Sequence, residues 1–344
     1  MVDLKKRELK EQEDESMKYS GFLLSSATAA MITILAQVPV WAADTIRVSY
    51  ETTDTHLKAR TVAIFKKELE STSGGKLSVE TYPGASLIPS KQEVSAAIRG
   101  QVEAIVPFIS YYESITPKAK LLTTPLVFRG YEHLMKAMEG EVGASIFADL
   151  EAKGLKPLGF WYETPTVVFT SKTKVETLDD IKGLKIRTYP SATLESMLGA
   201  LGANPTVIPG NEVYMALQNG VVDGAVTTPS FAVSMKLDEV LKYITDIKLV
   251  FGGYIFAMNK SFYDGLSSDM QTKINDAAKV ATAWNQKEIY GEIDVSLEKA
   301  AKNGVSVLPA SEKEIARWQA AMKSVHDGAD PAVKKLMQMA ASID

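Results

Sequence analysis

The sequence predicts an α/β protein built as two lobes of similar design. Its 344 residues are enough for two separate hydrophobic cores. Alternation of apolar and polar residues at 46–50 and 76–82 flanks an amphipathic helical pattern over 57–71, which is typical of a parallel strand–helix–strand unit. A helix–strand unit then recurs, because Glu93-Val94 and Glu212-Val213 each lead a helix, a glycine and a short apolar strand. The recurrence favours two related lobes, although two common helix–strand units could also match by chance.

The remaining elements follow from the same patterns. Ser191, after Pro190, is expected to cap a helix over 192–201, and Ser268 to cap a long helix that ends near 303. Gly100 and Gly220 suit left-handed helix C-caps. Further strands are expected at 102–106, 158–162, 167–170, 184–187, 222–226 and 305–308, with a terminal helical pair after the last one.

Two segments are expected to cross between the lobes as hinge strands, one near 165–170 and one near 251–254. The long helix joins the lobes as well. One lobe is therefore expected to comprise 44–165 and 254–292, and the other 166–253 and 293–330, with a C-terminal tail over 331–344.

The N-terminal segment has the pattern of a secretory signal peptide over 17–42. Lys18 precedes an apolar run of small residues, and Val40-Trp41-Ala42 supplies small residues at the cleavage positions. Residues 1–16 carry ten charges, which does not suit a signal sequence, so we interpret them as an upstream, non-native extension before Met17. The mature protein is expected to begin near Ala43 and to reside in the periplasm.

Composition excludes several classes of function. A net charge of −4 and the lack of a basic cluster argue against a nucleic-acid partner. The chain has no cysteine, so it has no disulfide, thiol nucleophile or thiolate metal site. Its three histidines lack metal-ligand spacing, and no nucleophile elbow, phosphate loop or dinucleotide fingerprint is present. We therefore expect no metal, no cofactor and no catalytic residue.

The strongest candidate for ligand binding is Arg187. The alternation of Leu184 and Ile186 with Lys185 and Arg187 predicts a short strand that ends where a helix begins. A guanidinium group at such a junction can hold a carboxylate bidentately, although a solvated arginine on a strand edge fits these residues equally well. Other candidates follow predicted strand ends, where ligands of open α/β sheets bind. They are Glu51, Phe108, Ser110, Tyr111, Trp161, Tyr162, Thr227, Thr228 and Phe231.

Three motifs taken together resemble the solute-binding proteins of TRAP (tripartite ATP-independent periplasmic) transporters. They are Tyr82-Pro83-Gly84-Ala85-Ser86-Leu87, the run from Leu178 to Arg187, and Glu212-Val213-Tyr214-x-Ala216-Leu217-Gln218-x-Gly220-x-Val222-Asp223-Gly224. The resemblance implies a two-lobed type II periplasmic-binding fold with the ligand cleft between the lobes. It also implies that Arg187 pairs with the carboxylate of a small organic acid, which a membrane permease then receives.

The chain also departs from this pattern. It has Thr166-Val167 where sialic-acid-binding relatives carry a second arginine, and Phe108 where they carry an acid. It has Thr227-Thr228 where some keto-acid-binding relatives hold a metal. These differences predict one carboxylate site without a metal bridge.

The ligand expected from this set is a monocarboxylate with an aliphatic or aromatic body. Ser110, Thr227 and Thr228 would supply hydroxyl contacts, and Glu51 would either pair with a ligand amine or be a solvated turn residue. We expect a monomeric transport protein. Two alternatives remain, a ligand sensor that docks on a membrane receptor and a secreted enzyme on the same fold.

Overall fold

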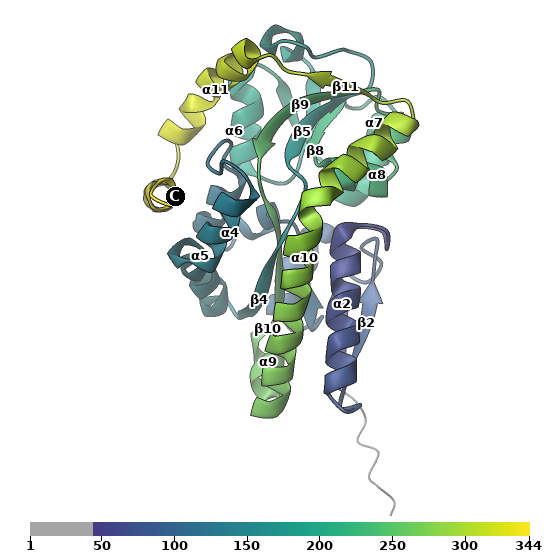
Figure 1. The fold of residues 1–344 in the computed structure, drawn as a ribbon, viewed down its shortest axis with the longest axis vertical. Helices are drawn as coiled ribbons and strands as arrows, with labels where there is room; N and C mark the ends of the chain where they lie inside the picture. The colour runs from purple at the N-terminus through teal and green to yellow at the C-terminus, as the bar shows by residue number, and fades with distance from the viewer. Residues whose placement is uncertain (1–43) are drawn as a thin grey trace, which may run out of the picture. The chain divides into compact units, whose positions relative to one another are not determined.

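The computed structural model describes residues 44–344, and these form two β-sheets with helices packed around each (Figure 1). The predicted extension over 1–16 and the signal peptide over 17–42 lie outside the described residues. The first sheet has the strand order β2-β1-β3-β10-β4. Its strands are β1 (Asp44–Ser49), β2 (Leu77–Tyr82), β3 (Ala104–Ile105), β4 (Leu155–Tyr162) and β10 (Gly253–Asn259).

The predicted parallel unit at the start of the chain is confirmed. Helix α2 (Leu57–Thr72) joins β1 to β2, and these strands pair in parallel from Asp44 opposite Leu77 to Ser49 opposite Tyr82. Three more helices belong to this part of the chain, α4 (Tyr131–Glu139), α5 (Glu141–Ala152) and α9 (Lys260–Gly265). Strands β1 and β3 are parallel, and β10 is antiparallel to both β3 and β4, so β1, β3 and β4 end at the same edge of the sheet. The candidate residues of this half follow these strand ends.

The second sheet has the order β11-β9-β5-β8-β6-β7. Its strands are β5 (Thr166–Thr170), β6 (Lys185–Thr188), β7 (Asn204–Val207), β8 (Gly224–Thr227), β9 (Tyr243–Val250) and β11 (Ser306–Pro309). Helix α6 (Ala192–Ala200) follows β6, and the Ser191 side chain accepts a hydrogen bond from the Leu194 N–H, as the sequence predicted. Helix α8 (Pro229–Ser234) follows β8 in the same way.

The repeated unit is present in both sheets, in a register one residue different from the one that the Glu-Val pairs suggested. Helices α3 (Glu93–Ile98) and α7 (Val213–Gln218) each end two residues before a glycine with positive φ, Gly100 at 72° and Gly220 at 67°. Glu93 therefore occupies the position of Val213, not that of Glu212. Both Glu93 and Val213 are buried, whereas Glu212 is exposed.

Three segments connect the two sheets. Residues 163–165 lead from β4 to β5, and residues 251–252 lead back from β9 to β10. The third is helix α10 (Ser268–Lys302), which packs on α2 and β4 and, further along, on α8 (Figure 1). This helix begins at the predicted Ser268, but the side chain that caps it is Ser267, which accepts from the Met270 N–H at 3.3 Å.

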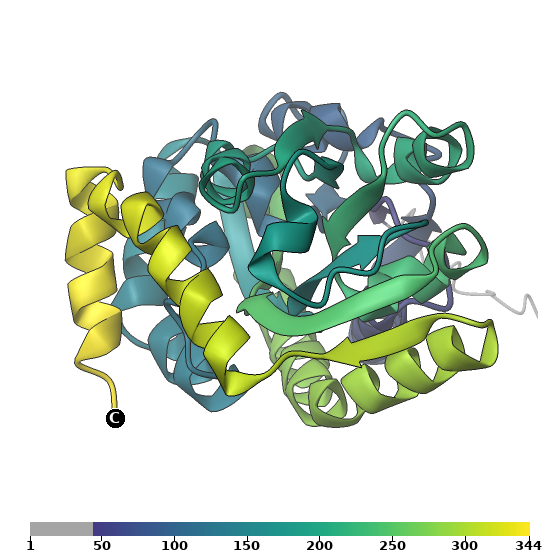
Figure 2. The same cartoon turned by 90° about the horizontal axis from the view of Figure 1, so that it is seen from above.

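The predicted terminal helical pair is also present, as α11 (Glu312–Asp327) and α12 (Pro331–Ala341). Helix α11 packs on α6 of the second sheet, and α12 packs on the segment Pro117–Thr123 beside the first sheet. Both helices are yellow in Figure 2. Residues 331–344, which we expected to be a tail, thus contain a packed helix.

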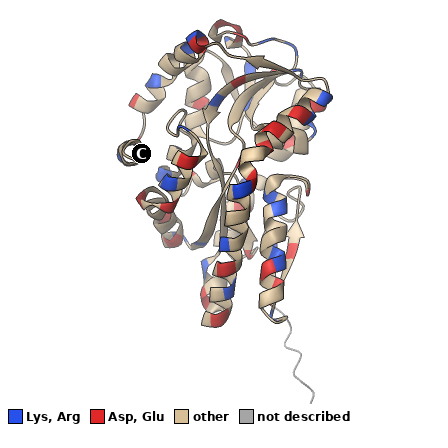
Figure 3. Cartoon of the chain, viewed as in Figure 1, with Lys and Arg blue, Asp and Glu red and all other residues tan. Residues whose placement is uncertain are grey.

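Acidic and basic side chains are interspersed along α2 and α10 (Figure 3). Across residues 44–344, no helix combines the length and the apolar character that crossing a bilayer would require.

Candidate functional site

The centre of the site is Arg187 near the end of β6, whose side chain is fully buried. Its Nε donates to the Ile208 carbonyl oxygen at 2.8 Å, which fixes the plane of the guanidinium group. Its Nη1 and Nη2 atoms are buried and have no hydrogen-bond partner among residues 44–344. Burial lowers the pKa of Arg187 from its usual value, but an arginine remains charged in a protein. A buried cation with two free donors is costly, so the geometry calls for an anionic acceptor.

An aromatic stack supports this guanidinium group. The Tyr189 ring centroid lies 4.5 Å from the Arg187 Cζ atom, and Phe108 stacks on Tyr189 with ring centroids 4.6 Å apart. The Tyr189 hydroxyl also shares a 3.0 Å hydrogen bond with Thr227 Oγ1. Phe108 belongs to the segment after β3, whereas Tyr189 and Thr227 belong to the second sheet. The stack therefore joins the two halves directly beside Arg187 and keeps water away from it.

A group of buried charges lies at the end of β1. Lys58 Nζ is 3.0 Å from Glu51 Oε1, and both side chains are buried. Ser49 Oγ donates to Glu93 Oε1 at 2.9 Å. Burial and the nearby charge of Glu51 raise the pKa of Glu93 to about 8, against the opposing effect of Lys58. Glu93 is therefore mostly protonated at neutral pH, and the Lys58–Glu51 pair compensates its own charge.

Several polar side-chain atoms of the candidate site are buried but have no hydrogen-bond partner among residues 44–344. Burial raises the pKa of the Tyr111 phenol most, the charge of Glu51 raises it further, and the charge of Arg187 opposes this. A methyl group placed on Gly210 would lie 3.0 Å from the Phe231 ring and 3.4 Å from Glu51 Cγ, so Glu51 meets the second half at this glycine. The partnerless atoms include Glu51 Oε2, Ser90 Oγ, Glu93 Oε2, Ser110 Oγ, Tyr111 Oη and both Arg187 Nη atoms.

A cavity of about 370 Å³ opens at the seam between the two halves, beside Ser110 and Tyr111, and Arg187, Glu51 and Glu93 are not among the residues that line it. Ser110, Tyr111 and Lys91 line it from the first half, and Pro190 and Val207 line it from the second. It begins where the partnerless hydroxyls of Ser110 and Tyr111 lie, and it could admit a small polar molecule.

The structure does not bring three of the predicted residues to Arg187. Trp161 stacks on Phe256, and its Nε1 donates to Thr282 Oγ1 of α10 at 3.1 Å. Tyr162 packs edge-on against Phe160, and its backbone N–H donates to Asn285 of α10. Thr228 accepts from the Phe231 N–H and so caps α8 instead of facing a ligand. All three side chains are already engaged in the protein's own packing.

Ser230, His56 and Glu163 resemble a hydrolytic triad but cannot act as one. Ser230 Oγ donates to Glu163 Oε1, and His56 Nε2 lies 2.9 Å from Glu163 Oε2. His56 Nδ1 accepts from the Lys58 N–H at 3.0 Å, so the hydrogen of the ring is on Nε2, the atom that faces Ser230. A general base needs a free nitrogen toward the hydroxyl, and this histidine offers a donor there. The group instead ties the β4–β5 crossing to α2 and α8.

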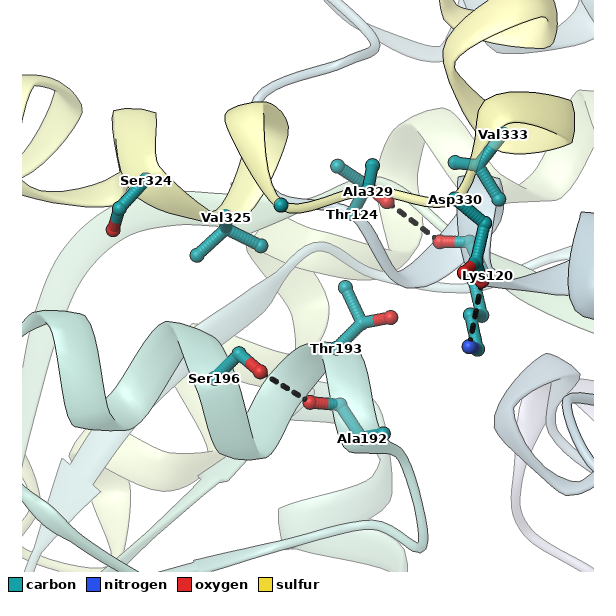
Figure 4. Close-up of a pocket in the computed structure, with 11 residues that line it drawn as sticks. Lys120, Thr124, Ala192, Thr193, Ser196, Ser324, Val325, Ala329, Asp330 and Val333 are labelled. Atoms are coloured by element: carbon teal, nitrogen blue, oxygen red, sulfur yellow. Dashed lines mark hydrogen bonds and ion pairs between the residues drawn. The ribbon is translucent and has the colours of Figure 1, made fainter.

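The cavity in Figure 4 is not a second ligand site. It measures about 150 Å³ and lies between α6, the segment over 117–123 and the link between α11 and α12. Lys120 pairs with Asp330 at 2.8 Å, Ser196 donates to the Ala192 carbonyl oxygen, and Thr124 to that of Lys120. Lys120, Asp330, Ser196 and Thr124, which line it, therefore already have partners within the protein.

Four residues of the site were not predicted from the sequence. Tyr189 could have been predicted, because it follows Arg187 by two residues and so continues the same face of the strand. Glu93 would have been singled out by aligning the repeated units on Gly100 and Gly220. Lys58 and Gly210 gave no signal, because their roles depend on contacts across the fold.

Comparisons with known proteins identify the family of the chain. Residues 48–330 match the family described as bacterial extracellular solute-binding protein, family 7. A C4-dicarboxylate-binding periplasmic protein of Rhodobacter capsulatus is 32% identical over 272 residues, which are 78% of this chain and 81% of that protein.

Two solved structures illustrate the fold. A TRAP periplasmic solute-binding protein of Sulfurospirillum deleyianum, with bound succinate, matches with a TM-score of 0.84 at 28% identity and covers 87% of this chain and 99% of its own. A sugar-acid-binding protein of Advenella mimigardefordensis, in complex with galactonate, matches with a TM-score of 0.84 at 25% identity. The match covers 87% of this chain and 98% of that protein. The chain thus belongs to family 7 of the bacterial extracellular solute-binding proteins: it is a TRAP solute-binding protein with the two-lobed type II fold, and it serves transport, not catalysis.

Proposed function

We propose that this protein captures a small organic acid by pairing its carboxylate with Arg187 and delivers it to the permease of a TRAP transporter. The single observation that carries the proposal is the buried Arg187 guanidinium group, whose Nη1 and Nη2 atoms have no acceptor among residues 44–344. A carboxylate fits both donors in the bidentate arrangement that arginine prefers. The chain is proposed to act as a monomer in the periplasm after removal of residues 17–42.

The relatives support an acid as the ligand, because they are named for C4-dicarboxylates or were solved with succinate and galactonate. We retain from the sequence analysis a single strongly held carboxylate, since Arg187 is the one buried guanidinium group in the described site. We do not retain an apolar body. Trp161 and Tyr162 pack on α10, Phe108 stacks on Tyr189, and the partnerless atoms nearby are polar. The proposed ligand is a polar acid.

We also propose that the two sheets mark two lobes that close around this ligand as rigid bodies. The short crossings at 163–165 and 251–252 would act as the hinges. The bonds between Thr53 and Ser234 and between Glu113 and Ser191 each link the two halves and would form on closure.

Native mass spectrometry and a thermal-shift screen test the proposal together. The purified protein is expected to carry a co-purified organic acid, and added acids of the correct class should raise the melting temperature by mass action. The screen should include succinate, malate, galactonate, galacturonate and hexanoate, with neutral sugars as controls. Stabilisation by neutral sugars and by none of the acids would contradict the proposal.

A further inference from the structure

The Glu51 carboxylate is held at one oxygen and free at the other. Lys58 Nζ lies 3.0 Å from Oε1 and also donates to the Val106 carbonyl oxygen at 3.1 Å. The same ammonium group lies 4.0 Å from the centroid of the Tyr254 ring. Glu51 Oε2 is buried and has no hydrogen-bond partner among residues 44–344. The lysine therefore fixes the carboxylate so that one acceptor remains unused in the described part of the chain, where Glu51 meets Gly210 of the second half.

We propose that Glu51, held in place by Lys58, selects organic acids that carry a hydroxyl group over matched acids that lack one. The inference rests on the proposed function, because it assumes that the ligand's carboxylate is at Arg187. It assigns the ligand to the hydroxy acids, which include malate and the sugar acids, and it disfavours succinate and aliphatic monocarboxylates.

The chemistry of a buried carboxylate oxygen supports this assignment. Such an atom can only accept hydrogen bonds, and leaving it without a donor is unfavourable. A second ligand carboxylate has no hydrogen to give and would be repelled by Glu51. A methylene group would leave the oxygen unsatisfied. A hydroxyl group donates its hydrogen to Oε2 and, unlike an ammonium group, adds no charge.

Glu93 adds a matching second contact. Its Oε1 accepts from Ser49, while its Oε2 is buried and has no hydrogen-bond partner in the described part of the chain. Because it is mostly protonated at neutral pH, the free side of its carboxyl group can donate a hydrogen bond to a ligand oxygen. An acceptor at Glu51 and a donor at Glu93 together suit a hydroxyl group, which both donates and accepts.

The repeated unit shows that Glu93 is not needed for packing at its position. Its counterpart in the second sheet is Val213, which is also buried at the start of the equivalent helix. The same architecture thus accepts an apolar side chain there, and a buried glutamic acid is unfavourable for stability without a compensating role. A role in ligand selection accounts for it.

Isothermal titration calorimetry on the folded protein tests the inference with matched pairs of acids. Succinate is compared with L-malate and D-malate, and hexanoate with galactonate. The wild-type protein should bind at least one hydroxylated member of each pair at least about tenfold more tightly, as expected for a hydrogen bond to a charged acceptor. Equal or tighter binding of both succinate and hexanoate would overturn the inference whatever the variants do.

Two variants test whether the preference for hydroxylated acids comes from Glu51. One is Glu51→Gln, and the other combines Glu51→Gln with Lys58→Met; circular dichroism checks that each is folded. The double variant removes the whole ion pair, so it does not leave a buried lysine unpaired. The preference for hydroxylated acids should shrink to within about threefold, and Glu212→Gln, at an exposed glutamate, should leave it unchanged. A full preference in a folded Glu51 variant would also overturn the inference.

Arg187→Lys separates this inference from the proposed function. If wild-type binding depends on Arg187 but shows no preference for hydroxyl groups, the inference fails and the proposed function stands. If no acid binds the wild-type protein, both fail.

Discussion

The protein buries two polar groups between its halves, and they differ in whether their hydrogen bonds are complete. At the β4–β5 crossing, Glu163 receives hydrogen bonds from Ser230, Tyr254 and the Thr164 N–H and pairs with His56. At the end of β6, Arg187 has one bond to Ile208 and two nitrogens without a partner among residues 44–344. The first group is complete within the protein, and the second requires a partner from outside.

This difference separates a structural network from a binding site without reference to residue type. The network at Glu163 contains serine, histidine and glutamate, which are common in active sites, yet each of these three side chains has a protein partner. Burial raises the pKa of a carboxyl group, but the interactions with His56, Ser230 and Tyr254 lower the pKa of Glu163 to about 2. The burial of Glu93, next to Glu51, raises its pKa to about 8. The surroundings of the two buried glutamates thus shift their pKa values in opposite directions.

The largest expected effect on stability comes from breaking the complete network. Glu163→Ala removes the acceptor of several buried donors and should lower the free energy of unfolding by about 3–5 kcal/mol. Chemical denaturation measures it, with the exposed Glu176→Ala as the matched control, which should change stability by less than about 0.5 kcal/mol. A loss below about 1 kcal/mol at Glu163 would mean that this network does not hold the crossing.

The two glutamates should also give opposite pH dependences. In the folded state the pKa of Glu93 is raised from 4.5 to about 8. Between pH 4.5 and about pH 8 the folded state therefore binds more protons than the unfolded state, so stability falls as pH rises through that window. The pKa of Glu163 is lowered, so its contribution to stability is fully present above pH 4.5 and is lost as the pH falls toward 2.

Glu93→Gln should therefore flatten the decline of stability from pH 5 to pH 8, by up to about 1.4 kcal/mol per pH unit. Denaturation at pH 5, 6, 7 and 8 measures the difference between the variant and the wild type. Parallel curves for the two proteins would show that Glu93 is ionised in the folded state.

A smaller effect is expected from removing the incomplete group. Without ligand, Arg187 is a buried charge whose two Nη atoms have no partner in the described part of the chain, so Arg187→Met should leave the free energy of unfolding unchanged or raise it by about 1 kcal/mol. The exposed Arg99→Met is the control for loss of charge. Destabilisation of the ligand-free protein by more than about 2 kcal/mol would indicate that Arg187 has a structural role.

The sequence predicted most of the fold and the centre of the site. Local patterns identified β1, α2, β2 and α6, because each has a clear period or a capping residue. Arg187 was found because a strand end before a capped helix is a local feature. The pattern could not show that its guanidinium group would be fully buried, since the stack beside it includes Phe108 from a segment of the first half.

The surroundings of Arg187 were predicted less well for a related reason. Trp161 and Tyr162 are at a strand end, but a strand end does not indicate whether its side chains face the cleft or the long helix. Glu51 was left open between a solvated and a cleft position, because its partner Lys58 is seven residues away on the next element. The role of Glu93 was hidden by aligning the repeat on its Glu-Val pairs instead of on its glycines.

The central claim is that Arg187 holds the carboxylate of the ligand, and calorimetry on Arg187→Lys and Arg187→Ala tests it most directly. With the best acid from the thermal-shift screen, Arg187→Ala should lose about 2–5 kcal/mol of binding free energy. Arg187→Lys should also bind more weakly than the wild type, because an ammonium group cannot reproduce the two parallel bonds of the guanidinium fork. Wild-type affinity in a folded Arg187→Ala variant would contradict the claim.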